Sequence, residues 1–82
     1  MAVTESDVEA AVAEILTSIG VEPDLISGPA ILGKELELDS TDAVEVGLEL
    51  KRRFKVTVKV QVKGDETVDT LVGQVLTELA AQ

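Results

Sequence analysis

Hydrophobic side chains recur with helical spacing in three parts of the chain, at about residues 4–19, residues 40–54 and residues 68–80. In each part the apolar positions repeat every three or four residues, so they fall on one face of a helix. The pattern therefore predicts three amphipathic helices that pack together through these faces. The predicted core positions are Val8, Ala11, Val12, Ile15, Leu16, Ile19, Ala43, Val46, Gly47, Leu50, Phe54, Val68, Leu71, Val72, Val75, Leu76 and Leu79.

Polar residues indicate where the helices begin. Ser6 followed by Glu9 has the spacing of a capping box for the first helix, and Thr4 followed by Asp7 is an alternative start. Thr67 is the expected N-cap of the last helix, because its hydroxyl can accept a hydrogen bond from a free backbone N–H.

Residues 21–39 are predicted to form a long first loop. It follows Gly20, which suits the left-handed residue after a helix, and it is interrupted by proline and glycine. Loops of this length are uncommon in compact domains unless they are functional or disordered. Six apolar residues argue against disorder and predict that the loop packs against the helices: Leu25, Ile26, Ile31, Leu32, Leu36 and Leu38.

Residues 55–63 have a different pattern, with valine at every even position and polar residues between. Alternation of this kind is typical of a half-buried strand. The chain offers no second strand, and an isolated strand leaves its backbone groups unpaired. We therefore predict an extended connection that buries one or two valines. The alternative is a short irregular helix near residues 60–64.

Composition narrows the range of functions. The 82 residues predict one domain, residues 1–82, and the absence of His and Cys excludes zinc fingers, disulfides, cysteine nucleophiles and Ser-His-Asp triads. Asp39 and Asp65 could each open a calcium loop, but neither has glycine at the sixth position, so no metal is expected. The prediction is an all-α fold, a small antiparallel helical bundle with three main helices and a short or irregular third segment, and not an enzyme.

The net charge of −9 disfavours nucleic acid and favours partners that present Lys and Arg. Charge is also distributed in blocks, since residues 51–63 contain six bases and no acid. The N-terminus lacks a basic segment followed by an apolar run, and no apolar stretch is long enough to span a membrane. We therefore expect a soluble cytoplasmic monomer that binds neither nucleic acid nor membrane.

The start of the second predicted helix contains most of the candidate functional residues. Asp39 precedes Ser40, and Asp42 and Glu45 follow on the exposed side. A purely structural interpretation is that Ser40 is the N-cap and that the acids stabilise the positive end of the helix dipole.

A second, narrower apolar strip lies beside the predicted core face of this helix. It consists of Val44 and Leu48, next to Thr41 and Lys51. The strip has no obvious use inside the bundle, so it is a candidate surface for a partner.

With these surroundings the sequence resembles the acyl carrier protein family. The family motif is an Asp-Ser pair that opens the second helix, followed by an acid, in a helix that ends in Phe. It corresponds here to Asp39, Ser40 and Asp42 in a helix that closes at Phe54. The resemblance also covers the length, the acidity, the long first loop and the order of the helices.

This resemblance implies that Ser40 carries 4′-phosphopantetheine, attached by a phosphopantetheinyl transferase, with acyl groups held as thioesters on the terminal thiol of the arm. It also implies that acyl-loading and acyl-accepting enzymes with basic docking faces are partners. The implied recognition residues are Asp39, Thr41, Asp42, Val44, Glu45 and Leu48. The acyl chain is expected to fold back between the helices.

Three departures from the family pattern suggest a specialised fatty-acid, polyketide or lipopeptide pathway. Thr41 stands where Leu or Met is usual, Gly47 replaces a larger core residue, and residues 51–53 are basic where the helix commonly ends in acids. We hypothesise that Gly47 widens the acyl cavity, and that the basic run repels partners adapted to an acidic helix. A peptidyl carrier fits less well, because residues 37–39 lack the glycine-rich stretch of that group. The alternative function is a small acidic interaction adaptor without a prosthetic group.

Overall fold

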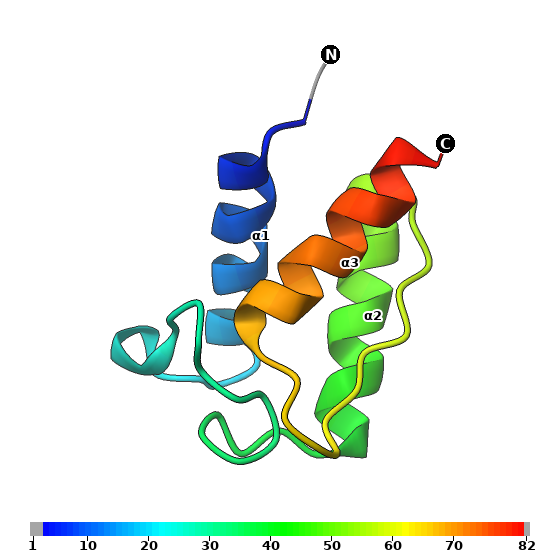
Figure 1. Cartoon of the computed structure of the whole chain (residues 1–82). Helices are drawn as coiled ribbons and strands as arrows, with labels where there is room; N and C mark the ends of the chain where they lie inside the picture. The colour runs from blue at the N-terminus through cyan, green and yellow to red at the C-terminus, as the bar shows by residue number, and fades with distance from the viewer. Residues whose placement is uncertain (1–2, 82) are drawn as a thin grey trace.

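The computed structural model describes residues 3–81, which form three α-helices: α1 (Glu5–Ser18), α2 (Ser40–Phe54) and α3 (Val68–Ala80). A short 3-10 turn, η1 (Pro23–Leu25), lies in the first loop. Figure 1 shows α1 running opposite to α2, with α3 crossing beside them. The predicted small all-α helical bundle is confirmed. Met1 and Ala2 lie outside the described residues. They belong to the N-terminal segment in which the sequence shows no basic stretch followed by an apolar run.

Hydrogen bonds at the helix starts decide between the alternative caps. Asp7 N donates to Thr4 Oγ1 at 3.2 Å, and Thr4 N donates to Asp7 Oδ2 at 3.0 Å. Thr4 is therefore the N-cap of α1, and the alternative is wrong because Ser6 already lies within the first turn. The prediction for α3 is confirmed, since Thr70 N donates to the Thr67 hydroxyl at 3.1 Å.

The first loop packs against the helices through its own apolar side chains, as predicted. Leu32, Leu36 and Leu38 are buried, whereas Leu25 is 52% exposed and does not join them. Gly20 has a φ of +104°, which confirms the left-handed residue after α1. The loop therefore adds a layer of aliphatic side chains to the core.

The backbone of the same loop pairs with the approach to α3. Leu32 N donates to Glu66 O at 2.9 Å, and Val68 N donates to Ala30 O at 3.0 Å. Asp69 N adds a third bond, to Gly28 O at 3.0 Å. These bonds satisfy backbone groups that would otherwise be unpaired, and they fix the position of the chain before α3.

The chain between α2 and α3 is extended and contains no helix, so the favoured prediction is confirmed and the helix near 60–64 is wrong. Lys55 ends α2 with a left-handed φ of 60°, and the chain then runs back along α2 (Figure 1). Val56 and Val58 are buried and Val60 is half-buried. The valine alternation is therefore explained by burial of one side of the segment, without a partner strand.

The core is made of aliphatic side chains from all three helices, the first loop and the extended segment. Its fully buried large members are Val8, Val12, Ile15, Leu16, Leu32, Val46, Leu50, Leu71 and Val75. Phe54 is only partly buried against them. Within residues 3–81 no helix has the length and apolar character needed to cross a membrane.

Candidate functional site

Ser40 is the first residue of α2, and the cap belongs to its neighbour. Asp42 N donates to Asp39 Oδ1 at 2.9 Å, and Asp39 N donates to Asp42 Oδ2 at 3.3 Å. This reciprocal capping box makes Asp39 the N-cap, so the interpretation of Ser40 as the cap is wrong. The helix start is stabilised without the serine hydroxyl.

The Ser40 side chain is consequently available. The residue is exposed, and its hydroxyl makes no hydrogen bond to any residue that the structure describes. It lies at the positive end of the α2 dipole, where free backbone N–H groups favour negative charge. A phosphate ester at this oxygen would therefore meet no burial barrier and a favourable local field.

The turn that leads into α2 contains an unusual backbone conformation. Glu37 has a φ of 57°, in the left-handed region that favours glycine. Two residues later the chain reaches Asp39 in an extended conformation, as an N-cap requires. The first loop holds this turn, because Leu38 N donates to Leu32 O at 3.1 Å.

An open groove of about 620 Å³ runs between α2 and the extended segment. This volume lies within the range of about 300–1,000 Å³ that is common for small-molecule sites. One wall consists of α2 residues spaced by three and four positions, and the other consists of residues 57–63. The α2 wall comprises Ser40, Ala43, Val44, Gly47, Leu48 and Lys51.

Gly47 lies on the α2 wall, beside Val58 and Val60 of the other wall. A Cβ added at Gly47 would lie 3.5 Å from Val58 O and 4.0 Å from Val60 Cγ2. These are ordinary van der Waals distances, so the space beside Gly47 accepts a methyl group. Gly47, which has no side chain, faces the Val58 carbonyl and the Val60 side chain here, and together these groups form the floor of the groove.

The sequence-predicted recognition residues divide into two groups. Val44 and Leu48, at 62% and 57% exposure, share the groove wall with Ser40. The other predicted residues do not line the groove: Asp39, Thr41, Asp42 and Glu45. Asp42 is half-buried and engaged in the capping box, whereas Thr41 and Glu45 are exposed beside the wall. Of the predicted docking face, only the apolar part and Ser40 therefore line the groove, and the acidic part lies outside its lining.

The basic run at the end of α2 is also divided. Arg52 Nη1 lies 2.8 Å from Glu49 Oε1, and Arg53 Nη1 lies 3.2 Å from Glu14 Oε1. Arg53 thereby links α2 to α1. Lys51 takes part in no ion pair within residues 3–81 and lines the groove instead.

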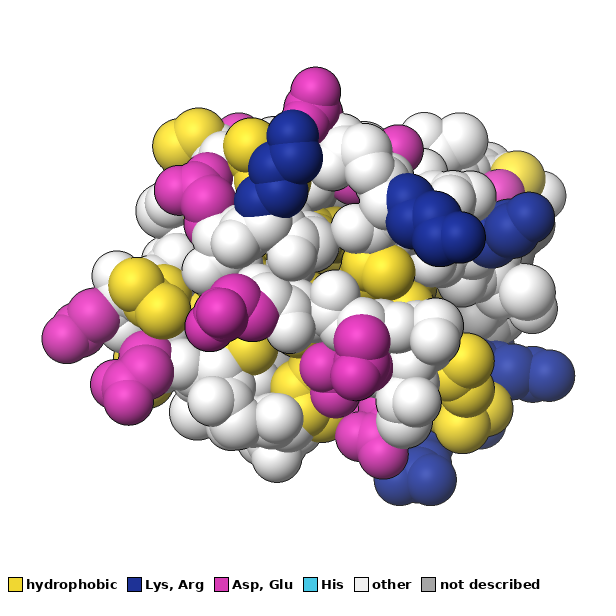
Figure 2. Space-filling model, turned by 90° about the horizontal axis from the view of Figure 1, so that it is seen from below, with side chains coloured by type: hydrophobic (Ala, Val, Ile, Leu, Met, Phe, Trp, Pro, Cys, Tyr) yellow, Lys and Arg dark blue, Asp and Glu magenta, His cyan; other side chains and the backbone are white. Residues whose placement is uncertain are grey.

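Two groove residues were not identified from the sequence as candidates, Lys59 and Lys63. The signal for them was the alternation itself, because odd positions of the segment turn away from the core when the valines turn toward it. On the face seen from below in Figure 2, most of the visible Lys and Arg side chains lie toward one side, and most of the visible Asp and Glu side chains are scattered over the centre and the other side. Within the described residues the groove lining contains no acid.

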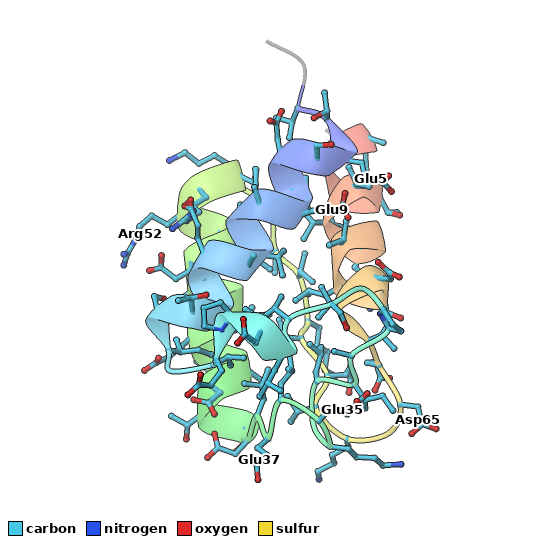
Figure 3. The ribbon with its side chains drawn as sticks, turned by 90° about the vertical axis from the view of Figure 1, so that its left-hand side faces the viewer. Glu5, Glu9, Glu35, Glu37, Arg52 and Asp65 are labelled. Atoms are coloured by element: carbon cyan, nitrogen blue, oxygen red, sulfur yellow. The ribbon has the colours of Figure 1, made fainter. Side chains whose placement is uncertain are left out.

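The face opposite the extended segment is acidic. Figure 3 shows Glu5 and Glu9 on α1 and Glu35 and Glu37 on the first loop, and Glu35 Oε1 accepts a hydrogen bond from Ile31 N at 2.9 Å. No group of three or more His, Cys, Asp and Glu within residues 3–81 is placed to hold a metal ion. None of these four glutamates lines the groove.

A surface ion pair joins the first loop to the end of the extended segment. Lys34 Nζ donates to Asp65 Oδ1 at 2.8 Å. This hydrogen bond, together with the opposite charge, raises the pKa of Lys34 and lowers the pKa of Asp65. Both side chains are exposed, so the pair is screened by solvent and contributes little to stability.

No match to this chain was found among protein-family models, curated proteins or solved structures. Function is therefore inferred from the residues of the site themselves, and above all from an unengaged serine hydroxyl at a helix start that opens onto a groove.

Proposed function

We propose that this protein is a carrier of acyl groups, with Ser40 as the attachment point for 4′-phosphopantetheine, and that it is not itself an enzyme. The observation that carries the proposal is the Ser40 hydroxyl, which is exposed, unengaged and adjacent to a groove. When bound, 4′-phosphopantetheine supplies a thiol that carries acyl groups as thioesters. The residues around Ser40 fit the group, because nothing in the structure covers the hydroxyl or competes for it.

Asp39 and Asp42 prepare the site for modification. Their capping box fixes the first turn of α2 and so fixes the direction of the Ser40 side chain. The N-terminal end of the helix stabilises the negative charge of a phosphodiester by an amount on the order of 0.3–1 kcal/mol at an exposed site. The proposed role of Asp39 is therefore recognition and positioning of its neighbour.

The partners proposed are a phosphopantetheinyl transferase and acyl-loading and acyl-accepting enzymes with basic docking faces. Glu45 and Thr41 are exposed beside Ser40, and Val44 and Leu48 offer apolar surface next to it. Apolar residues surrounded by charge are typical of contact sites between proteins. A basic partner surface would meet the acids at the start of α2 by charge complementarity.

The groove is proposed to hold the acyl chain, in a carrier that serves a specialised fatty-acid, polyketide or lipopeptide pathway. Gly47 keeps the floor free of a side chain, in agreement with the hypothesis that this position sets the room available. Gly47→Val adds branches beyond the Cβ, which must either displace the extended segment or enter the groove. We expect Gly47→Val to change the preference for chain length, and an unchanged preference would contradict this role of Gly47.

The test of the carrier function is modification of purified protein with coenzyme A and a broad-specificity phosphopantetheinyl transferase, followed by intact mass measurement. We expect a gain of one phosphopantetheine in the wild type and none in Ser40→Ala. Ser6→Ala is the matched control, because Ser6 is also an exposed serine in the first turn of a helix. It should be modified as the wild type is.

The alternative function, an acidic adaptor that binds a partner helix through Val44 and Leu48, needs no prosthetic group. Absence of the mass gain with a transferase that modifies a known carrier in parallel would favour the adaptor. A second transferase, chosen for carriers of specialised pathways, completes the test, because the altered helix could be rejected by the first.

A further inference from the structure

The groove between α2 and the extended segment has an apolar interior and a cationic rim. Val44, Leu48 and Val60 give it aliphatic surface, while Lys51 stands on one wall. Lys59 and Lys63 stand on the other wall. No carboxylate from the described part of the chain lines it. A neutral aliphatic chain needs only the apolar surface, so the lysines require a separate explanation.

The lysines at the groove are also the bases without acidic partners. In residues 3–81 the ion pairs are made by Lys34, Arg52 and Arg53, and none of these three residues lines the groove. The chain has more than twice as many acids as bases, yet three lysines around one groove form no ion pair with any residue from 3 to 81. Their charge is therefore available to a ligand.

We propose that the groove holds an aliphatic chain that ends in a carboxylate, with Lys51 and Lys59 facing the charged end. The inference rests on the proposed function, because the chain is then the acyl group carried at Ser40. It names the cargo as an acyl group with a second, distal acid function. The apolar wall contacts the chain, and the lysines stabilise its end.

The position of Lys51 agrees with a chain that starts at Ser40. The two residues lie on the same wall, eleven positions apart, which corresponds to about 16 Å along a helix. Lys59 belongs to the segment that runs back along α2 (Figure 1). A chain joined directly to position 40, as in the conjugates described below, can follow the wall past Gly47 and reach Lys51 in the last turn of α2, whereas in the proposed carrier the phosphopantetheine arm lies between Ser40 and the acyl group.

The groove is large enough for a small ligand. Its volume of about 620 Å³ lies within the range of about 300–1,000 Å³ that is common for small-molecule sites. The hollow on the other side of the extended segment, of about 530 Å³, makes a useful contrast. It is lined by Glu78 and several threonines, shares Lys59 with the groove and does not include Ser40.

The test attaches the aliphatic chain to position 40 by a chemical reaction, so it does not depend on any transferase. The protein has no cysteine, so Ser40→Cys provides a single thiol that can form a mixed disulfide with a dodecyl chain or with a carboxyl-ended chain of the same length. Thermal unfolding and amide chemical shifts of residues 57–63 are then compared between the two conjugates and the unconjugated variant.

We expect the carboxyl-ended conjugate to unfold about 2–6 °C above the methyl-ended one at neutral pH and low salt, because exposed ion pairs are individually weak. The difference should shrink at about 1 M salt, where charges are screened. Lys51→Gln with Lys59→Gln should remove most of it. Lys34→Gln, which removes the same kind of charge away from the groove, should leave it unchanged.

Equal unfolding temperatures for the two conjugates would overturn the proposal. It would also be overturned if Lys34→Gln reduced the temperature difference as much as Lys51→Gln with Lys59→Gln does. Unshifted amides in residues 57–63 would overturn the groove as the site of the chain. Each of these outcomes is independent of whether Ser40 accepts phosphopantetheine, which the intact-mass experiment decides separately.

Discussion

Gly47 offers the sharpest test of how closely the extended segment packs against α2. Glycine inside a helix is less favourable than alanine by about 0.8–1 kcal/mol. The Cβ of an alanine here would lie 3.5 Å from Val58 O and 4.0 Å from Val60 Cγ2, so no strain offsets the gain. Gly47→Ala should therefore raise the free energy of unfolding by about 1 kcal/mol, which corresponds to about 4–8 °C in Tm for a small domain.

The measurement is urea and thermal unfolding followed by circular dichroism, with Gly73→Ala as the matched control. Gly73 is also inside a helix, α3, and a Cβ there meets no atom within 4 Å. It reports the helix-propensity gain alone. The two variants should be stabilised equally, and the dependence of unfolding free energy on urea should not change, because neither variant alters the surface exposed on unfolding.

If the expectation fails, comparison of the two variants shows which assumption is wrong, the space beside Gly47 or the gain in helix propensity. If Gly73→Ala is stabilising and Gly47→Ala is not, then the Val58 carbonyl lies closer to α2 than the structure shows, and the helix must shift to admit a methyl group. If neither is stabilising, helix propensity does not limit the stability of these helices. Either outcome would refute the reasoning as it stands.

Three further changes probe the first loop. Gly33→Ala should destabilise by about 1–3 kcal/mol in urea unfolding, because its Cβ would collide with the Val62 carbonyl, and an unchanged midpoint would contradict this packing. Glu37→Gly should stabilise by about 1 kcal/mol by relieving the left-handed backbone, and a loss of stability would instead point to the entropy of glycine. Asp65→Asn should destabilise slightly at neutral pH. Since the Lys34 partner lowers the pKa of Asp65, its contribution is present above the ordinary aspartate range and is lost as pH falls through the lowered value, so the variant and wild type should converge in acid.

The helices were predictable because their apolar periodicity is strong and local. The extended segment was harder, because its valine alternation is the same whether one side packs on a sheet or on a helical core. Because the sequence has no second segment with the pattern of a strand, an extended connection was correctly preferred to a strand in a sheet. The capping boxes of α1 were ambiguous because Thr4 with Asp7 and Ser6 with Glu9 share one spacing, and only the fold shows which box starts the helix.

The groove could not be predicted from the sequence, because it is formed by two segments that meet only in the fold. Lys59 and Lys63 looked like the solvated side of an alternating segment, and they became groove residues when that segment returned along α2. The basic run after Leu50 looked like one unit. The structure divides it, because Arg53 reaches α1 and Lys51 does not.

Asp39 and Ser40 have separate roles at the start of α2, since Asp39 caps the helix and Ser40 leaves its hydroxyl available. If Ser40 were the N-cap, then modification of its oxygen would remove a hydrogen bond from the helix start, and stability and loading would be coupled. Because Asp39 caps α2, the Ser40 oxygen can be substituted while the helix keeps both bonds of its capping box. Replacement of an N-cap by alanine costs about 1 kcal/mol. Asp39→Ala should therefore lower the free energy of unfolding by that amount, whereas Ser40→Ala should leave it nearly unchanged. Equal losses in both variants would show that the serine hydroxyl does stabilise the helix start and is not free for attachment.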